Sequence, residues 1–513
     1  MRSPFRRRRV VLVAILFATA FPVLFSPAVA RSGTATLRID PEALSGRITQ
    51  YLLGEPELAS GSAGSPLFGS NIRLSDEHFT RRLISQTEPA IAAAPNGQDV
   101  VAGFHDLWPK TQDFVCRIAF TRDGGATWNL GGATPLQTSG NFCSDPALAA
   151  DAQGNFYYAY LDINFGAIRS DIDVAKSTDG GQTFSTFSVA ANGHPSTNFP
   201  DKEFITVDRW PGSPHEGTIY VSWTDFLNPQ DPQALDNGQI KVVVSRDGGA
   251  TWSAPVALSD SAQFPRAISG SVPVVAPDGT AYVFYADFIS NTGPLSIRFS
   301  RSTDGGATWS APAPVATGLA SPGRFRLRNA DPDFGVLAGR GFRSNSFPSA
   351  AIGPDGKIYV VWTDFPSASS CTNDGSGRPP CEDANVRMAV STNGGFTWSA
   401  PAKVSDERGS AGTTDQFFPW VAVDAGGRAH VIWQDKRLDA ANQNFDTFYT
   451  STNDGSSFAR NVRVSSATSI AGLTTFIGDY NNIAVAGSQI FPVWTDRRAR
   501  NNDIFTAKGV ARG

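Results

Sequence analysis

The stretch Ser302-Thr-Asp-Gly-Gly-Ala-Thr-Trp309 is one of six closely related copies in this chain. Asp-Gly and Gly-Gly steps between apolar runs supply the positive φ angles of a tight hairpin, and the Asp side chain can bond the turn backbone. The closing Trp or Phe is an apolar anchor for the next strand. The other copies begin at Thr121, Ser177, Ser245, Ser391 and Ser451, and in the last two we expect Asn393 and Asn453 to replace the Asp. A motif that returns about every 50 to 90 residues predicts repeated modules with structural turns.

A second repeat gives an independent count of the modules. In this repeat a strand-like segment reaches an aromatic or small residue, and an Asp follows two positions later. The pattern occurs seven times, at Asp106, Asp162, Asp225, Asp287, Asp364, Asp435 and Asp496. The segment from Ala350 to Val404 contains a complete module: two strands joined by a turn, a variable loop, a third strand, the Gly-rich hairpin and a fourth strand. Four strands per module are typical of a propeller blade. We therefore predict an all-β fold, a seven-bladed β-propeller, in which these Asp residues are turn or cap residues.

The last module lacks a hairpin and a fourth strand after its third strand, around Ile504 to Ala507. The segment Asn71 to Asp76 resembles fourth strands elsewhere, such as Pro255 to Asp260. We therefore predict that Asn71 to Ser75, an N-terminal strand, closes the last blade and covers sheet edges that would otherwise be exposed. A six-bladed ring with an appended hairpin is the alternative.

The first 30 residues differ from the rest of the chain. Arg6 to Arg9 precede an apolar run from Val10 to Phe25, and Ala28-Val29-Ala30 offers a small-residue cleavage site. We therefore expect a signal peptide at 1–30, a linker at 31–70 and the propeller domain at 71–513, in a secreted or periplasmic protein that keeps no membrane anchor after cleavage. The net charge of −4 argues against a general affinity for nucleic acid.

Four cysteines fit an oxidising compartment. Cys371 and Cys381 bracket a polar loop that one disulfide could close, and Cys116 and Cys143 are the remaining pair. The sequence has no C-x-x-C spacing and its five His residues are scattered. We expect disulfides, with no metal site and no cofactor.

The hairpin pattern S-x-D-x-G-x-T-W is the Asp box, and residues from about 71 to 511 resemble an Asp-box (BNR repeat) propeller of the sialidase superfamily. The resemblance implies that the Asp boxes lie on the face opposite any active site, and it makes a six-bladed sialidase-type propeller the specific alternative to seven blades. The superfamily contains sialidases, other glycoside hydrolases, and propellers that only bind or scaffold. The resemblance therefore implies a fold more specifically than an activity.

Sialidases use a Tyr nucleophile activated by a Glu, an Asp acid/base, and three Arg that clamp the substrate carboxylate. The resemblance gives the catalytic candidates Tyr480, Glu203 and Asp106, with Glu88 and Asp162 in comparable positions. Guanidinium groups suit a carboxylate because they offer parallel donors, and the substrate-binding candidates are Arg266, Arg437, Arg497 and Arg498. The structural alternatives are a packed Tyr480 and Arg side chains paired with nearby Asp residues. The chain also departs from the family, since Gln86-Thr-Glu-Pro89 stands where sialidases have an Arg-Ile-Pro motif.

The Arg-rich insertion from Ala320 to Ser346 is expected to cross the face opposite the Asp boxes, where its charge would attract an anionic sugar or pair with nearby Asp residues. The first functional hypothesis is an exported monomer that recognises a glycan or glycoconjugate, with exo-sialidase-like hydrolysis of terminal acidic sugars as its more specific form. The alternative is a non-catalytic propeller scaffold for a protein or cell-surface partner.

Overall fold

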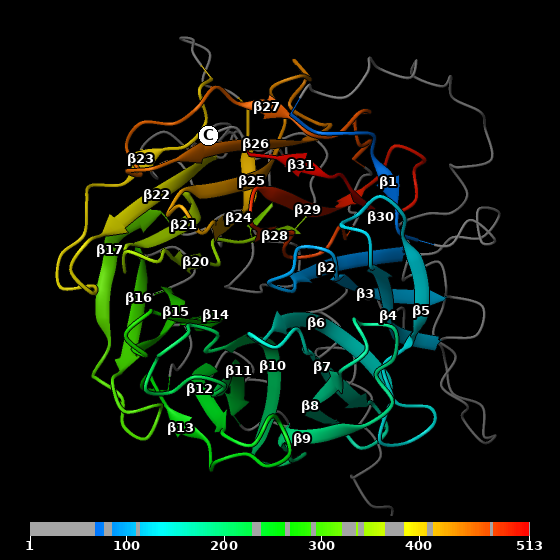
Figure 1. The fold of residues 1–513 in the computed structure, drawn as a ribbon, viewed down its shortest axis with the longest axis vertical. Helices are drawn as coiled ribbons and strands as arrows, with labels where there is room; N and C mark the ends of the chain where they lie inside the picture. Colours follow the sequence, from blue (N-terminus) through cyan, green and yellow to red (C-terminus); the bar gives the residue numbers. More distant parts are fainter. Residues whose placement is uncertain are drawn as a thin grey trace, which may run out of the picture.

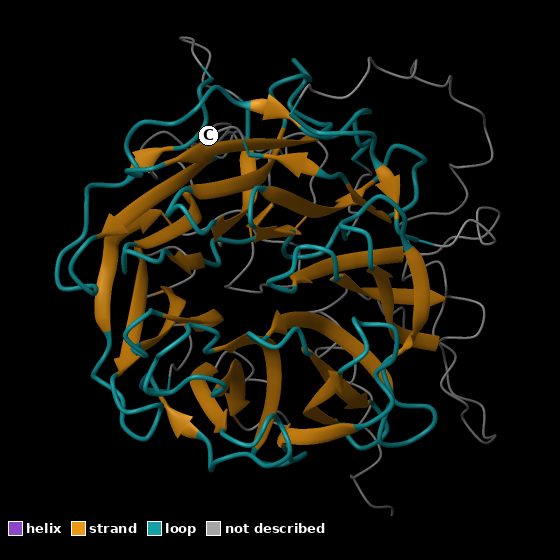
Figure 2. Cartoon of the chain, in the orientation of Figure 1, coloured by secondary structure: helices purple, strands orange, loops and turns teal. Residues whose placement is uncertain are grey.

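The computed structural model describes residues 67–75, 85–108, 113–227, 238–261, 267–288, 294–320, 335–336, 343–364, 384–407, 414–471 and 476–511. These residues form strands and loops and no helix (Figure 2), so none of them provides a helix that could cross a membrane. Seven antiparallel sheets stand around one axis as the blades of a propeller (Figure 1). The prediction of an all-β, seven-bladed propeller is confirmed, and the six-bladed alternative is wrong.

The first four blades follow one another along the chain, each with its strands in sequential order. Blade 1 comprises β2 (Ser85–Ala93), β3 (Val100–Trp108), β4 (Asp113–Thr121) and β5 (Asn129–Ala133). Blade 2 comprises β6 (Phe142–Ala150), β7 (Phe156–Asn164), β8 (Arg169–Ser177) and β9 (Phe187–Ala191). Blade 3 comprises β10 (Asn198–Val207), β11 (Ile219–Leu227), β12 (Gly238–Ser245) and β13 (Val256–Ala257). Blade 4 comprises β14 (Ala267–Val275), β15 (Ala281–Phe288), β16 (Pro294–Ser302) and β17 (Ala313–Ala320).

The remaining blades have the same strand order, after a separate pair formed by β18 (Gly335–Val336) and β19 (Arg343–Ser344). Blade 5 comprises β20 (Ser349–Ile352), β21 (Ile358–Asp364), β22 (Asn385–Ser391) and β23 (Ala402–Lys403). Blade 6 comprises β24 (Gln416–Val423), β25 (Ala429–Asp435), β26 (Asp446–Thr452) and β27 (Val462–Arg463). Blade 7 contains β28 (Asn482–Ala486), β29 (Gln489–Asp496), β30 (Asp503–Thr506) and β31 (Gly509–Val510).

The ring closes between the two ends of the described chain. Strand β1 (Ile72–Arg73) pairs antiparallel with β30, with Ile72 opposite Thr506, and so supplies the outer strand of blade 7. The Leu74 amide continues the pairing by donating to the Ile504 carbonyl at 2.8 Å. The predicted closing segment is therefore confirmed, and Figure 1 shows β1 beside β30.

Large aromatic side chains in the second strands fill the space between sheets. Trp223, Trp362, Trp433 and Trp494 are fully buried. Small residues allow other rings to pack close to the backbone: a Cβ at Gly103 would lie 2.4 Å from the Tyr158 hydroxyl. The interior is thus packed by the repeat itself, which leaves the axis and the two faces as places for a site.

The Asp boxes form the turns that the sequence predicts. In the fourth copy, the Ser302 hydroxyl donates to Asp304 at 2.7 Å and accepts the Gly306 amide at 2.8 Å, while the Thr308 amide donates to Asp304 at 2.9 Å. These bonds stabilise the ionised carboxylate. Hydrogen bonds from Thr251 and Ser245 likewise lower the pKa of Asp247 to about 2 in the third copy.

The sixth copy differs from the prediction. Asn393 does take the Asp position in the fifth copy, accepting the Thr397 amide at 3.0 Å. In the sixth copy, however, the carboxylate of Asp454 accepts the amides of Ser456 and Ser457, each at 2.8 Å, so the expected role of Asn453 is wrong. The turn begins one residue later at Thr452, whose hydroxyl accepts the Gly455 amide.

The strand directions define two faces of the ring. The Asp boxes join third to fourth strands, and because neighbouring strands are antiparallel, the turns between first and second strands lie on that same face, here called the Asp-box face. The opposite face, here called the loop face, carries the connections into each first strand and those between second and third strands. Most of the Arg-rich insertion lies outside the described residues.

Candidate functional site

The first strand of each blade lines the axis of the ring (Figure 1). In β2, β6, β10, β14 and β24 the pairing with the second strand shifts near the loop-face end, which marks a β-bulge. Four non-glycine residues there have positive φ: 56° at Glu88, 48° at Asp145, 55° at Lys202 and 50° at Phe418. Such conformations are costly for residues with a Cβ, and they concentrate at functional sites.

Three of these bulged residues meet at the axis, together with a residue of blade 7. The Lys202 ammonium lies 3.3 Å from Glu88 Oε1 and 3.5 Å from Asp145 Oδ1, and it also donates to Asp479 Oδ2. All four side chains are buried. We call Lys202, Glu88, Asp145 and Asp479 the central cluster. It joins blades 1, 2, 3 and 7 through one cation.

The protons of the central cluster are unequally shared. Burial raises the pKa of Glu88 well above its usual range, whereas the Lys202 ammonium and a hydrogen bond from Glu88 outweigh burial at Asp145 and lower its pKa to about 2. Glu88 is therefore the protonated member and donates to ionised Asp145. Nearby, burial lowers the pKa of His105 to about 4, so this ring, stacked on Phe114, is neutral at pH 7.

Glu203 follows Lys202 and is the most unusual carboxyl group of the site. It is completely buried, and within the described part of the chain neither of its oxygens has a hydrogen-bond partner in another residue. Burial raises its pKa well above the usual range, and the charge of Asp145 adds to this effect. Burial therefore favours the protonated form of Glu203.

Glu203 also breaks the repeat. The corresponding position of other first strands is proline in four blades, at Pro89, Pro146, Pro348 and Pro419. Proline suits this position because the edge of a first strand can do without a backbone donor. A buried acid in its place is a departure that packing does not require.

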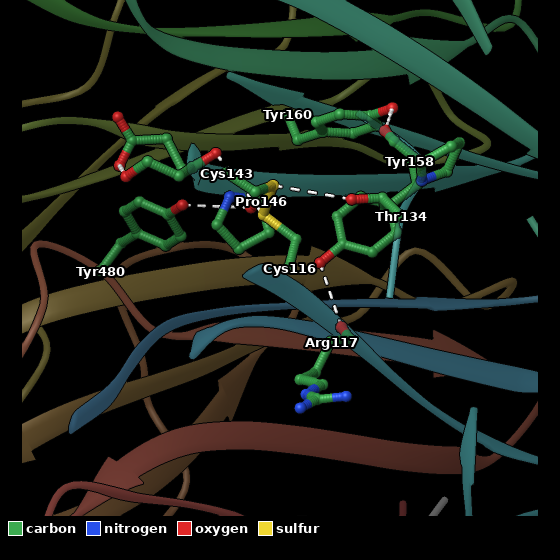
Figure 3. The surroundings of a disulfide bond; sticks show 11 residues. Cys116, Arg117, Thr134, Cys143, Pro146, Tyr158, Tyr160 and Tyr480 are labelled. Carbon is green, nitrogen blue, oxygen red and sulfur yellow. Dashed lines mark hydrogen bonds between the residues drawn. A yellow bond between two sulfur atoms is a disulfide. The ribbon is translucent and has the colours of Figure 1, made fainter. Parts of the chain in front are cut away.

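Tyr480 is a packed residue. Its ring contacts Phe204 and Trp420, with centroids 5.1 and 6.1 Å away, and its hydroxyl donates to the Pro146 carbonyl at 3.1 Å, beside the Cys116–Cys143 disulfide (Figure 3). Burial raises the pKa of Tyr480 well above 10, and the neighbouring carboxyl charges add to the shift. A nucleophilic phenolate would need the opposite shift. The structure thus brings Tyr480 and Glu203 together, in a setting that keeps both protonated.

The predicted Arg clamp is not assembled by the described residues. Arg437 bonds Asp435 and Asp406, each at 2.7 Å, and Arg498 bonds Asp496 at 2.7 Å. Arg497 donates to the backbone carbonyls of Ile470 and Arg500 and to Asn502. These three arginines hold loops together, as in the structural alternative, and Arg266 lies outside the described residues.

Asp106 has a structural setting that its counterparts share. Its carboxylate accepts Arg117 Nε at 3.0 Å. The same Asp position is paired with a cation in most blades, as in Lys241–Asp225, Arg298–Asp287, Arg387–Asp364, Arg437–Asp435 and Arg498–Asp496. Asp162 instead accepts the Gln137 amide and Asn141. The pairing of Asp106 with a cation is therefore a feature that recurs from blade to blade, and it accounts for this residue without a catalytic role.

One disulfide supports the site. Cys116 of β4 is bonded to Cys143 of β6, with their Cα atoms 5.5 Å apart, and it ties blade 1 to blade 2 two residues before Asp145. The predicted pair Cys371 and Cys381 lies outside the described residues. No cluster of metal-ligating side chains is present within the described ranges.

The sequence analysis names Glu203 and Tyr480 as candidates but not Lys202, Asp145 and Asp479, which the structure places beside them. Their signal was available in an alignment of the seven first strands, where charged residues stand directly before the proline position in blades 1 and 2 and before Glu203 in blade 3. The contact between them depends on convergence at the axis, which no local pattern reveals.

A model of the BNR repeat-like domain matches residues 233–330. Within this seven-bladed β-propeller, residues 233–330 are therefore similar to a BNR repeat-like domain. Comparison with curated protein sequences finds no match.

Among solved structures, the propeller is similar in fold to a Hadza microbial sialidase, at 14% identity and a TM-score of 0.42, covering 77% of this chain and 73% of that one. An α-L-arabinofuranosidase of Fusarium graminearum has 14% identity and a TM-score of 0.43, with 71% and 92% covered. A PL25 ulvan lyase has 12% identity and a TM-score of 0.45, with 84% and 94% covered. At these identities and TM-scores the likeness is one of general fold alone.

Proposed function

We propose that this β-propeller is an exported protein that binds a glycan on its loop face, over the end of the axis where the central cluster lies. The observation that carries the proposal is the concentration of charged residues in strained backbone at one point of an otherwise repeated fold. A repeated scaffold needs no such departure for its stability, whereas a binding site does.

The chemistry of this region suits a sugar. Carboxyl and ammonium groups exchange hydrogen bonds with hydroxyl groups, and the ring of Trp420, which is only half-buried, adds an apolar group. Small-molecule sites combine a few polar groups with such apolar walls. The glycan class itself rests on the resemblance of the Asp boxes to those of the sialidase superfamily.

Hydrolysis of a glycosidic bond is the second candidate function, and the divergent pKa values of two carboxyl groups favour it. Glu203 is held protonated, while Asp145 is held ionised with a pKa of about 2. Glycoside hydrolysis uses such a division between an acid and a carboxylate. In this mechanism Glu203 donates a proton to the leaving oxygen as the glycosidic bond breaks, and Asp145 stabilises the positive charge that develops on the sugar. Water then adds to the anomeric carbon and its released proton restores the Glu203 acid, while Tyr480 remains a packing residue.

The test combines a glycan-binding screen of the full chain with turnover of fluorogenic glycosides, including a sialoside. We expect saturable binding of at least one glycan, and at least a tenfold loss of affinity in Glu203→Gln. Turnover lost in Glu203→Gln and retained in Tyr480→Phe supports the carboxyl mechanism, and the reverse pattern refutes it. If no glycan binds to the folded wild type, the proposal fails in favour of a scaffold for a protein or cell-surface partner.

A further inference from the structure

The axis ends in a second distinctive place on the Asp-box face. A cavity of ≈ 200 Å³ opens there, lined by the ends of the seven first strands and by the turn that follows β10. Most of its lining side chains are small and apolar. Arg209 is the one charged side chain among the described residues that line it.

The turn that carries Arg209 differs from its six counterparts. In blade 2 the turn is closed by a hydrogen bond from the Asp151 amide to the Asn155 carbonyl, and blades 4, 5 and 6 have the same spacing. In blade 3 the corresponding bond runs from Asp208 to Thr218. The residues that correspond to Arg209 in the other blades are uncharged: Pro95, Ala152, Pro277, Pro354, Ala425 and Gly487. Among the described residues, only the turn of blade 3 places a cation in the lining of this cavity.

The turn is fixed on both sides of Arg209. Asp208 is buried and accepts the Trp210 amide at 3.2 Å and the Ser213 hydroxyl at 2.5 Å. Trp210 Nε1 donates to the Val275 carbonyl of blade 4 at 2.7 Å. Arg209 therefore protrudes from a rigid platform, and little ordering is required when it binds a ligand.

The guanidinium of Arg209 is free to bind a ligand. It forms no hydrogen bond or ion pair with the described residues and is exposed to solvent, yet protein surrounds it closely enough that desolvation lowers its pKa. It remains positively charged at neutral pH, because an Arg loses its proton only far above pH 7. A partly desolvated cation attracts an anion more strongly than one on an open surface.

The backbone adds further polar groups to the cavity. Each first strand is the last strand of its sheet, so one of its edges has no strand partner. Such an edge presents unpaired N–H and C=O groups. Amide donors together with the planar fork of a guanidinium are suited to an oxyanion.

We propose that the Asp-box end of the axis is a binding site for a small oxyanion, such as phosphate, sulfate or a carboxylate, held by Arg209. The site lies on the face opposite the proposed glycan site, and it stands or falls independently of that function.

The experiment titrates inorganic phosphate, sulfate and acetate separately into the full chain by calorimetry, with sodium chloride holding the ionic strength constant. We expect saturable binding of at least one anion, a loss of at least tenfold in Arg209→Gln, and a smaller loss in Arg209→Lys, which keeps the charge but not the fork. Arg122→Gln is the matched control, since Arg122 lies in the first Asp box, pairs with Asp99 and is 59% exposed. It should leave binding unchanged.

Thermal unfolding of each variant verifies that the propeller is intact. Equal affinities of wild type and Arg209→Gln would overturn the proposal, as would a wild type that binds none of the three anions. Glycan binding by Arg209→Gln should equal that of the wild type, which separates this site from the one on the loop face.

Discussion

Blades 2 and 3 have the same four strands and the same Asp box, but their first strands differ at both ends. At the loop face, Asp145 and Pro146 of β6 correspond to Lys202 and Glu203 of β10. At the Asp-box face, the short turn after β6 corresponds to the long turn that carries Arg209. The seven blades of a propeller have the same backbone architecture. A residue that differs from its counterparts in the other blades is therefore not explained by the repeat.

The difference shows how charge is distributed around the axis. Blades 1, 2 and 7 bring carboxyl groups to the loop-face end, and blade 3 brings the lysine that they share. Blade 3 also contributes Glu203 and Arg209. Substitutions in blade 3 and in its neighbours can therefore measure how much the residues that distinguish blade 3 contribute to the free energy of unfolding.

Replacing Lys202 with Met should cause the largest loss of stability. The change leaves buried Glu88, Asp145 and Asp479 without their cation, and removal of one partner from a buried ion pair costs about 3–5 kcal/mol. Urea unfolding at pH 7 measures the loss. The loss should shrink in acid, where the carboxyl groups become neutral.

Lys241→Met is the matched control for that substitution. Lys241 pairs with the single carboxylate of Asp225 at the repeated second-strand position, and its side chain is 21% exposed. Asp225 is itself fully buried, but it is one carboxylate rather than three and it keeps the hydrogen bond from Asn198, so the loss should be smaller than in Lys202→Met. Equal losses in the two variants would contradict the special role of Lys202.

Removing the Cys116–Cys143 disulfide should have the next largest effect. The bond closes a loop with a sequence separation of 27, for which a chain-entropy estimate gives about 3–4 kcal/mol. Thermal unfolding of a Cys116→Ala/Cys143→Ala variant checks this value. The measured loss can be compared with that of Lys202→Met, because a covalent bond links blade 2 to blade 1 whereas ion pairs of Lys202 link blade 3 to its neighbours.

A reductant distinguishes this bond from any other. It should lower the unfolding temperature of the wild type by more than it lowers that of the double-alanine variant. Equal shifts would mean that the bond between Cys116 and Cys143 contributes little to stability.

Much of the fold was predictable because its determinants are local. The Asp boxes fold within eight residues, and the seven Asp residues at second-strand ends count the blades. The closing strand at Ile72 was also predictable, since its sequence resembles other fourth strands. The mistaken role of Asn453 has a local cause as well: Asp454 is one residue away and is the better acceptor for the turn amides.

The site was only partly predictable because its members converge from distant blades. Tyr480 was selected by residue type, and only packing against Phe204 and Trp420 shows that it is a core residue. Arg437 and Arg498 were selected as clamps, whereas each bonds an Asp two residues earlier. Lys202 was overlooked because an isolated lysine in a sequence does not reveal three carboxyl partners.

Glu203→Gln should change the pH dependence of stability. The pKa of folded Glu203 lies well above the unfolded value of about 4.3, so the folded state holds a proton that the unfolded state releases. The contribution of Glu203 to wild-type stability therefore falls as the pH rises above about 4, until the folded pKa is reached. Glu203→Gln lacks this pH-dependent loss, so its unfolding temperature relative to the wild type should rise as the pH increases above about 4.

Asp173→Asn is the control for that substitution. Asp173 lies in blade 2, and burial, with the charge of Asp162 adding to it, raises its pKa to about 8. Its replacement should also remove a pH-dependent loss of stability, but it should leave glycan binding unchanged. An equal loss of glycan binding in both variants would show that Glu203 acts only through stability.

Tyr480→Phe should have the smallest effect. The ring and its contacts with Phe204 and Trp420 remain, and only the hydrogen bond to the Pro146 carbonyl is lost. One such bond contributes about 1 kcal/mol, which urea unfolding can resolve. If the wild type hydrolyses a glycoside, this variant should keep its turnover within a few-fold, because the phenol is buried and protonated. A loss of a hundredfold or more in a stably folded variant would return Tyr480 to the reaction and would place the chemistry in blade 7 rather than blade 3.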